Sequence, residues 1–249
     1  MLDKSRLTFV EKDNTNTAEI ARFDKLAASW WDPNGQYQQV LAFNACRWKL
    51  IEQQITHYFS GCDLSKLNAL DVGCGGGLLC EPLARLGMTV TGVDASAMSI
   101  AVAQRHAQQG GLAIEYRHCL ADALLKDNRQ FDIVINTEVI EHVPDQQALL
   151  DDCCSLLKPG GLLVLATLNR TIKSYIVAIV GAEYVMRMLP VGTHSWKAFV
   201  KPLELQAMLQ PGQCDVFSEV GLKYNPLTKV WRKSNDVSVN YLQFAAKKA

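Results

Sequence analysis

Short apolar runs alternate with amphipathic stretches through the middle of the chain, from about residue 69 to residue 167. A short apolar run bounded by turn residues is typical of a buried strand, whereas apolar residues at every third or fourth position predict a helix. The expected strands are Ala69–Val72, Thr89–Asp94, Ile114–Cys119, Phe131–Asn136 and Leu162–Thr167. The expected helices are Leu78–Leu86, Ser96–Gln109, Ala121–Leu125 and Gln146–Leu157, the last ended by Pro159-Gly160-Gly161. This alternation predicts an α/β fold with a mostly parallel sheet and right-handed crossovers.

Further elements flank this core on both sides. Residues 1–16 are polar and are expected to form a flexible N-terminus, while residues 17–249 are expected to form a single domain with an insertion at about 169–194. On the N-terminal side we expect a helix with Thr17 as N-cap and Ile20, Phe23, Leu26 and Ala27 on one face, then a turn at Asp32-Pro33 and a helix over Phe43–Phe59. On the C-terminal side we expect a helix from Lys201-Pro202 and strands Val216–Val220 and Val239–Ala246. The total is seven strands, with the last antiparallel.

A glycine-rich turn follows the first expected strand. Asp71, Gly73 and Gly75 fit the form Asp-x-Gly-x-Gly, and glycine suits such a turn because it lacks a Cβ and tolerates positive φ. Asp94 ends the second strand, 21 residues after Gly73, where a carboxylate can accept hydrogen bonds from ribose hydroxyls. A dinucleotide turn, Gly-x-Gly-x-x-Gly, would need glycine in place of Leu78. The pattern therefore favours S-adenosylmethionine, whose sulfonium an acid at Asp71 can help hold, over a dinucleotide.

Composition narrows the class of protein. The 249 residues carry 25 Lys and Arg against 25 Asp and Glu, and because nucleic-acid binders are usually basic, no nucleic-acid partner is expected. The 8 cysteines form no Cys-x-x-Cys pair and no zinc spacing. Together with the lack of a signal peptide after Met1, this indicates a reduced, cytoplasmic protein. No apolar run reaches the ~18 residues that span a bilayer.

Several short motifs occur together along the chain. They are Trp30-Trp31-Asp32, Asp71-Val72-Gly73-Cys74-Gly75-Gly76-Gly77, Glu138-Val139-Ile140-Glu141-His142-Val143-Pro144-Asp145, Lys158-Pro159-Gly160-Gly161, Thr167-Leu168-Asn169-Arg170, Val180-Gly181-Ala182-Glu183-Tyr184-Val185-Met186-Arg187-Met188, Gly192-Thr193-His194, Tyr224-Asn225-Pro226 and Asp236-Val237-Ser238-Val239-Asn240-Tyr241. With these motifs, residues 17–245 closely resemble the ubiquinone-biosynthesis O-methyltransferases. Many methyltransferases share the glycine turn and Lys-Pro-Gly-Gly, whereas the Gly181–Tyr184 segment and the two C-terminal motifs are more specific.

The resemblance implies a Rossmann-like, seven-stranded S-adenosylmethionine-dependent methyltransferase fold with N-terminal helices and an insertion after strand five. It implies O-methylation of polyprenylated catechols at two steps of ubiquinone biosynthesis, on 2-polyprenyl-6-hydroxyphenol and 3-demethylubiquinol. The implied cofactor-binding residues are Arg47, Gly73, Asp94 and Thr137, and the glycine turn adds Gly75 to the expected set. A guanidinium fork suits the carboxylate of the methionine moiety, although a solvated helix arginine is the competing interpretation of Arg47. Thr137 departs from the methionine that similar bacterial members tend to have, so a contact through the backbone would survive the change and one through the thioether would not.

Two carboxylates and an imidazole, Glu138, Glu141 and His142, follow the fourth strand at the sheet edge where ligands gather in open α/β folds. In a helical turn their spacing would place all three on one face. They are the expected catalytic residues, and they suit a divalent metal such as Mg²⁺, on which some members of the similar family depend. A metal bridging both catechol oxygens would favour phenolate, and His142 as a general base is the metal-free alternative. The simplest alternative gives Glu141 and His142 only a loop-forming role.

A polyprenyl tail is insoluble, so the enzyme must take its substrate from a bilayer or a partner. The segment Tyr175–Leu189 is apolar, and Arg170 and Lys173 flank it. This composition suits a helix lying in a membrane interface or covering an apolar channel, and equally suits packing over the sheet. The expected location is cytoplasmic, with peripheral association at the inner face of the membrane, and other ubiquinone-biosynthesis proteins are expected partners.

Three alternatives stay open beside a prenylated-catechol methyltransferase. The first is a methyltransferase of the same fold acting on another small phenol, against which the Gly181–Tyr184 segment argues. The second is a dinucleotide oxidoreductase, which Leu78 disfavours. The third is a non-catalytic member that binds the cofactor and organises a biosynthetic complex, and the intact Glu138, Glu141 and His142 argue against it.

Overall fold

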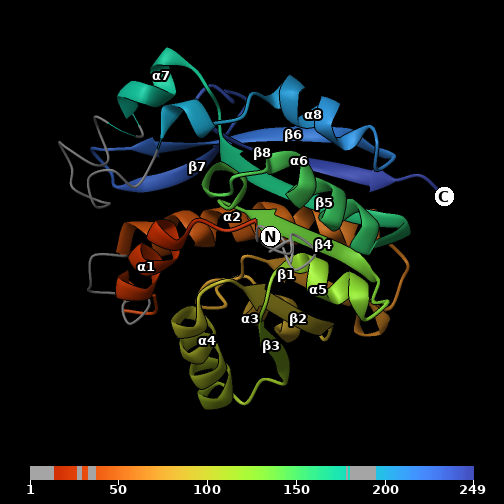
Figure 1. Cartoon of the computed structure of the whole chain (residues 1–249). Coiled ribbons are helices and arrows are strands. Elements are labelled where there is room, and N and C mark those ends of the chain that lie inside the picture. Colours follow the sequence, from red (N-terminus) through yellow and green to blue (C-terminus); the bar gives the residue numbers. More distant parts are fainter. Residues whose placement is uncertain (1–13, 27–29, 33–37, 178, 180–194) are drawn as a thin grey trace, which may run out of the picture.

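The structure is a computed structural model that describes residues 14–26, 30–32, 38–177, 179 and 195–249, without the side chains of residues 23, 25 and 26. Figure 1 shows a central sheet with helices on both of its faces. The turn after Asp32 and residues 180–194 of the insertion lie outside the described residues, as do residues 1–13 of the expected flexible N-terminus.

One sheet of eight strands runs through the described part of the chain in the order β3-β2-β1-β4-β5-β8-β6-β7. The strands are β1 (Asn68–Val72), β2 (Thr89–Asp94), β3 (Ile114–His118), β4 (Phe131–Thr137), β5 (Leu157–Leu168), β6 (Cys214–Asn225), β7 (Val230–Ser234) and β8 (Asn240–Lys247). The first five pair in parallel, and β8 lies antiparallel between β5 and β6. Strands covered on both faces need apolar residues at successive positions, which explains the continuous apolar runs in the sequence.

Helices cover both faces of this sheet. They are α1 (Thr17–Leu26), α2 (Gln38–Tyr58), α3 (Cys80–Arg85), α4 (Ala97–Gln109), α5 (Ala121–Lys126), α6 (Gln146–Leu156), α7 (Ile172–Ser174) and α8 (Pro202–Leu209), with the short 3₁₀ helices η3 (Leu64–Lys66), η4 (Ile140–His142) and η6 (Trp196–Ala198). Helices α2, α3 and α4 pack with Ala69 and Ile133 on one face. Helices α5, α6 and α8 pack with Leu70 and Val134 on the other. Because side chains alternate along a strand, neighbouring residues serve two separate cores.

The predicted α/β fold is confirmed, with a parallel core and an antiparallel last strand, but the sheet has eight strands rather than the seven predicted. The additional strand, β7, pairs antiparallel with the end of β6, where Tyr224 and Trp231 are partners. Its sequence is largely polar and its residues are mostly exposed, as is usual for an edge strand. Only the pairing with β6 identifies this segment as a strand.

Several predicted boundaries are corrected by local hydrogen bonds. Asn16 rather than Thr17 caps α1, because its Oδ1 accepts from the amides of Ala18 (3.1 Å) and Glu19 (3.4 Å). The helix before β5 ends at Leu156, so Pro159-Gly160-Gly161 do not end it. These three residues belong to β5 itself, in an irregular stretch where the pairing with β4 shifts register.

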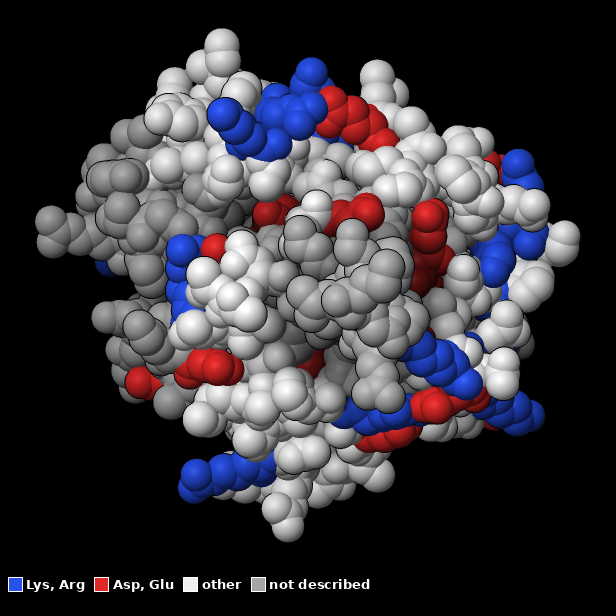
Figure 2. Space-filling model, in the orientation of Figure 1, with Lys and Arg blue, Asp and Glu red and all other residues white. Residues whose placement is uncertain are grey.

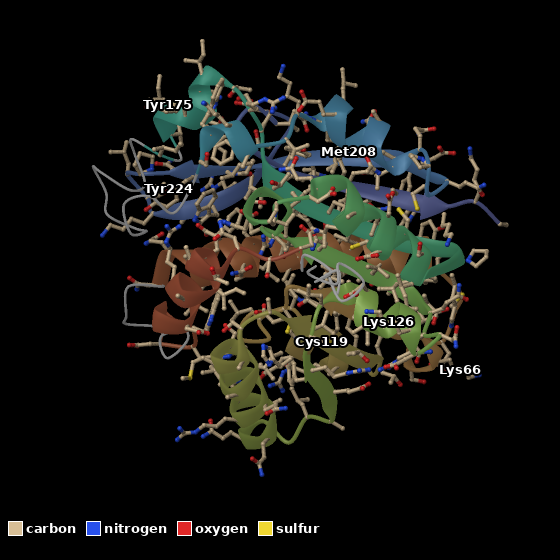
Figure 3. The ribbon with its side chains drawn as sticks, in the orientation of Figure 1. Lys66, Cys119, Lys126, Tyr175, Met208 and Tyr224 are labelled. Carbon is tan, nitrogen blue, oxygen red and sulfur yellow. The ribbon has the colours of Figure 1, made fainter. Side chains whose placement is uncertain are left out.

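The first part of the insertion is described. After α7, residues 175–177 and 179 continue as a wider helical turn. Ile172 of α7 and Tyr175 and Ile176 of this turn are exposed. Figure 3 labels Tyr175 on this turn, at the periphery of the molecule. Among the described residues, no helix combines the length and apolar character needed to cross a bilayer.

Candidate active site

A cavity of about 630 Å³ opens at the carboxyl ends of the parallel strands. Its walls come from α1, α2, the turn after β1, the ends of β2 and β4, and the β6–β7 pair. Cys119, next to β3, and Tyr224, on β6, both line it, and Figure 3 shows them on different sides of the sheet's middle strands. In Figure 2 the described basic and acidic side chains lie interspersed over the visible face, as the balanced charge predicts. The cavity rather than a charged surface is therefore the candidate site.

Two glycines shape the turn after β1. Gly73 and Gly75 have positive φ values of 74° and 52°, and a Cβ on Gly73 would lie 2.3 Å from Val139 Cγ2. The amide of Gly73 donates to Val93 O (2.8 Å), which ties the turn to β2. Both glycines line the cavity, as the Asp-x-Gly-x-Gly pattern predicted. Because neither glycine has a side chain of its own, Val139 packs closely against Gly73 and Trp30 against Gly75.

Asp94 holds this turn in place. Its Oδ2 accepts from the amide of Gly75 (2.8 Å), and its Oδ1 accepts from the amide of Ser96 (2.7 Å). Burial raises the pKa of the Asp94 carboxyl, and these two amides partly offset that effect. Each carboxylate oxygen can accept more than one hydrogen bond. Asp94 can therefore position the turn and still accept from a ligand in the cavity.

The paired tryptophans pack on the outside of the same turn. Trp31 Nε1 donates to Gly76 O (2.8 Å), and its ring stacks on His106 with centroids 3.6 Å apart. A Cβ on Gly76 would approach Trp30 to 2.7 Å, so only glycine allows this contact. Trp30 also lines the cavity. The sequence motif Trp30-Trp31 thus supports the glycine turn, a role the sequence analysis did not assign.

Arg47 is a buried cation beside the glycine turn. Its side chain on α2 is 4 % exposed, its Nη1 donates to Glu138 Oε1 (3.0 Å), and its Nη2 donates to Asn44 Oδ1. Among the described residues its buried Nε has no acceptor. Burial lowers the Arg47 pKa, and the carboxylates of Glu138 and Asp71 are the main charges that raise it. The burial excludes the solvated-helix interpretation, and the unpaired Nε fits an anionic ligand group.

Asp71 is a second buried charge at the same end. Burial raises the pKa of its carboxyl to about 7, and the Cys80 thiol, which donates to Asp71 Oδ2 at 3.4 Å, opposes this shift. A cation brought next to Asp71 would favour its ionised form.

Thr137 ends β4 at the same cavity and is buried. All five predicted cofactor residues therefore line one cavity.

The three predicted catalytic and metal-binding residues diverge. Glu138 has a positive φ of 57° and lies before η4 rather than in it, so the i, i+3, i+4 spacing does not put the three side chains on one helical face. Glu141 is buried behind the cavity wall, where its Oε2 accepts from Thr167 Oγ1 (2.8 Å). His142 lines the cavity, with Nδ1 3.0 Å from Glu19 Oε2. The expectation of a shared face is wrong, and no three His, Cys, Asp or Glu side chains of the described ranges form a metal-binding group.

Other lining residues were missed by the sequence analysis. Leu120 and Asp122 follow β3 and line the cavity, although the sequence predicted only a short helix there. Asn14 ties the start of the described chain to the loop after η4, because its Nδ2 donates to Asp145 O (2.7 Å) and its Oδ1 accepts from the Asp145 amide (2.8 Å). A polar residue after the third strand was the available signal for Asp122. No local signal marks Asn14.

Comparison with known proteins shows which family this chain belongs to. The sequence matches the family model described as a methyltransferase domain over residues 70–165. The ubiquinone biosynthesis O-methyltransferase of Bartonella tribocorum is 44% identical over 98% of this chain and 99% of its own. That of Caulobacter sp. (strain K31) is 47% identical over 92% of this chain and 94% of its own. The chain belongs to the ubiquinone biosynthesis O-methyltransferase family.

Solved structures show the same fold. The magnesium protoporphyrin IX methyltransferase of Synechocystis PCC 6803 with bound S-adenosylmethionine matches over 94% of this chain and 93% of its own, with a TM-score of 0.60 at 17% identity. The plantazolicin methyltransferase matches with a TM-score of 0.63 at 13% identity, over 94% of this chain and 99% of its own. As a member of the ubiquinone biosynthesis O-methyltransferase family, the protein is an S-adenosylmethionine-dependent enzyme. The predicted family, fold and enzyme class are confirmed, and of the predicted cofactors S-adenosylmethionine is confirmed.

Proposed function

We propose that this O-methyltransferase methylates a ring hydroxyl of polyprenylated catechols, 2-polyprenyl-6-hydroxyphenol and 3-demethylubiquinol. The observation that carries the proposal is the two-ended cavity. Its polar end holds Arg47, Asp71 and Asp94, and its other end is apolar and aromatic. A volume of about 630 Å³ lies within the range of small-molecule sites. A charged cofactor suits the first end, and a ring with a hydrocarbon tail suits the second.

The polar end fits S-adenosylmethionine group by group. The unpaired Nε of Arg47 suits the methionine carboxylate, and the remaining acceptor capacity of Asp94 suits the ribose hydroxyls. Asp71 supplies a carboxylate for the cationic part of the cofactor. Gly73, Gly75 and Thr137 complete this end of the wall. When bound, the cofactor supplies an electrophilic methyl group for in-line attack by a ring oxygen.

The attacking oxygen must lose a proton, because a phenol has a pKa of about 10. His142 lines the cavity and is the group we assign to receive that proton. With its Nδ1 proton donated to Glu19 Oε2 at 3.0 Å, a neutral imidazole carries its lone pair on Nε2. Burial lowers the His142 pKa, but the hydrogen bond to Glu19 and the nearby carboxylates outweigh it, so the pKa lies above its usual 6.5.

A divalent metal such as Mg²⁺ does not fit the arrangement of Glu138, Glu141 and His142. Glu138 pairs with Arg47, and Glu141 does not line the cavity, so the three donors do not meet at one point. The base mechanism through His142 is therefore the one we propose. A chelator titration tests it, since full activity in metal-stripped buffer with excess chelator is expected. Loss of activity that Mg²⁺ restores would establish the metal mechanism instead.

The insertion is the surface we propose for reversible contact with a lipid bilayer. Ile172 is 78% exposed and Ile176 is 55% exposed, Lys173 lies between them, and Val177 lines the cavity. An exposed apolar surface suits a membrane interface; Lys173 does not add a free charge to it, because it pairs with Asp236. Val177 connects that surface with the substrate cavity. Liposome co-sedimentation of an Ile172→Ser, Ile176→Ser double variant is expected to show weaker pelleting than wild type.

The matched control for the liposome experiment is Leu227→Ser. Leu227 is 93% exposed in the turn between β6 and β7, so the control removes an equally accessible apolar side chain from another surface. Its pelleting is expected to equal that of wild type. Equal pelleting of all three proteins would contradict a role for the insertion in membrane contact.

Product analysis by mass spectrometry tests the proposed substrate. Purified enzyme is incubated with S-adenosylmethionine and a short-chain analogue of either catechol. A gain of one methylene and one equivalent of S-adenosylhomocysteine are expected. Turnover of simple phenols in preference to the prenylated analogues would select another small phenolic substrate. Cofactor binding without turnover of any phenol would indicate a non-catalytic member.

A further inference from the structure

Three aromatic side chains, Phe43 of α2, Tyr224 of β6 and Trp231 of β7, form a wall of the cavity, here called the aromatic wall. The rings of Phe43 and Trp231 lie 4.7 Å apart between centroids, and those of Tyr224 and Trp231 lie 5.1 Å apart. Figure 3 shows Tyr224 on the β6–β7 side of the molecule. Strand β7 is the strand that the sequence did not predict. Its residue Trp231 lines the cavity. One effect of the added strand is therefore to place an indole against α2.

The aromatic wall is adjacent to the cofactor end of the cavity. The Arg47 guanidinium lies 5.0 Å from the centroid of the Phe43 ring, and Phe43 in turn contacts Trp231. Gln39, Phe43 and Arg47 are four residues apart in sequence, so they follow one face of α2. A ligand that fills the space beside this face would touch the cofactor region at one end and the aromatic wall at the other.

Two polar atoms of this region are buried without partners. Trp231 Nε1 has no acceptor and Gln39 Oε1 has no donor among the described residues, and both side chains line the cavity. Buried polar groups in native proteins nearly always have hydrogen-bond partners, so each such atom needs an explanation. An indole N–H only donates, and an amide oxygen only accepts. A phenolic hydroxyl both accepts and donates, so it is a ligand group that pairs with an atom of either kind.

We propose that the aromatic wall binds the acceptor ring and that Trp231 Nε1 donates a hydrogen bond to the catechol oxygen that is not being methylated. Gln39 Oε1 accepts the proton of that same hydroxyl. The inference rests on the proposed function, because it takes the acceptor to be a catechol. It assigns to Trp231 the recognition of the second hydroxyl, which distinguishes a catechol from a simple phenol. The rings of Phe43 and Tyr224 supply apolar contact for the substituted ring.

Binding to the enzyme saturated with S-adenosylhomocysteine tests the assignment without turnover. Calorimetry would measure the Kd of a short-chain prenylated catechol and of the matching phenol that lacks the second hydroxyl. Trp231→Phe keeps an aromatic ring and removes the N–H. A lost neutral hydrogen bond predicts an increase in the catechol Kd of roughly five- to tenfold. The Kd of the matching phenol is expected to change by less than about twofold, because its binding does not use the bond.

Trp48→Phe is the matched control. Trp48 lies on α2, the helix that carries Phe43. It packs against the core and does not line the cavity. The catechol Kd of Trp48→Phe is expected to match that of wild type. The S-adenosylhomocysteine Kd of Trp231→Phe is also expected to match that of wild type, which would show that this variant folds. An equal loss for both ligands, or no loss for the catechol, would overturn the hydrogen bond to Trp231. Failure of the wild-type protein to bind either ligand, with S-adenosylhomocysteine bound, would overturn the proposed acceptor itself.

Discussion

Replacing Asp94 by alanine should weaken cofactor binding far more than it weakens the fold. In the structure the carboxylate accepts the amides of Gly75 (2.8 Å) and Ser96 (2.7 Å), and we propose that it also accepts from the ribose hydroxyls of the cofactor. The substitution removes the proposed ribose acceptor and releases the amide of Gly75, so the turn loses one of its links to β2 and keeps the bond from the Gly73 amide to Val93 O.

The magnitude follows from the hydrogen bonds lost. A hydrogen bond to a charged group contributes about 1.5–3 kcal/mol, and partial rearrangement of the site reduces the sum for two ribose hydroxyls. A net loss of about 3 kcal/mol corresponds to a Kd raised roughly 100-fold. The cost to folding is smaller, because burial already raises the pKa of Asp94 and disfavours its ionised form.

Isothermal titration with S-adenosylhomocysteine measures this effect, and urea unfolding measures stability in parallel. Asp63→Ala is the matched control, because Asp63 also accepts a backbone amide, that of Ser65 (3.1 Å), but lies outside the cavity. Its Kd is expected to equal that of wild type. A Kd for Asp94→Ala within about threefold of wild type would refute the placement of the ribose, since a threefold change corresponds to well under 1 kcal/mol.

Three further changes test other parts of the site and fold. Gly221→Ala should lower the free energy of unfolding by about 1–3 kcal/mol, measured in urea, because the new Cβ would lie 2.1 Å from the backbone oxygen of Asp236. Glu19→Gln should move the acid limb of the kcat/KM profile to lower pH, because Glu19 helps raise the pKa of His142 and the base acts in its neutral form. Asp71, with a pKa of about 7, should release a proton near pH 6.5 when the cationic cofactor binds, as measured by calorimetry in buffers of different ionisation enthalpy.

Each of these expectations has a control. Gly110→Ala places its Cβ no nearer than 3.4 Å to a neighbouring atom, at a φ of −79° that suits alanine, so it should cost less stability than Gly221→Ala, and equal costs would count against the steric argument. An unchanged pH profile for Glu19→Gln would show that Glu19 does not act on the titrating group. Asp71→Asn should abolish the proton release, and persistence of the release would assign it to another residue.

The sign of the Asp71 effect on stability also follows from its raised pKa. The folded protein holds the proton of Asp71 more tightly than the unfolded chain does, so the protonated form favours folding. This contribution is complete below the unfolded pKa of about 4 and declines as the pH rises towards about 7. In the protein without cofactor, the contribution of Asp71 to the free energy of unfolding should therefore decrease as the pH rises through this range.

The parallel core was predictable because each buried strand leaves a continuous apolar run in the sequence. The cofactor end was predictable for a similar reason. Asp71, Gly73, Gly75 and Asp94 lie at the ends of adjacent parallel strands, and parallel strands bring these ends to one edge of the sheet. Strand β7 was not predicted, because an edge strand with polar residues has no distinct local pattern until it pairs with β6.

The sequence alone determined the order of elements and the glycine turn, since both depend on local periodicity and on the backbone freedom of single residues. Tertiary structure decided which side chains share the cavity. A positive φ at Glu138 separates three residues that a helical spacing would have grouped, while distant segments bring Glu19 to His142 and Trp231 to Phe43. Such contacts depend on how layers pack and not on neighbouring residues, so no local pattern in the chain contains them.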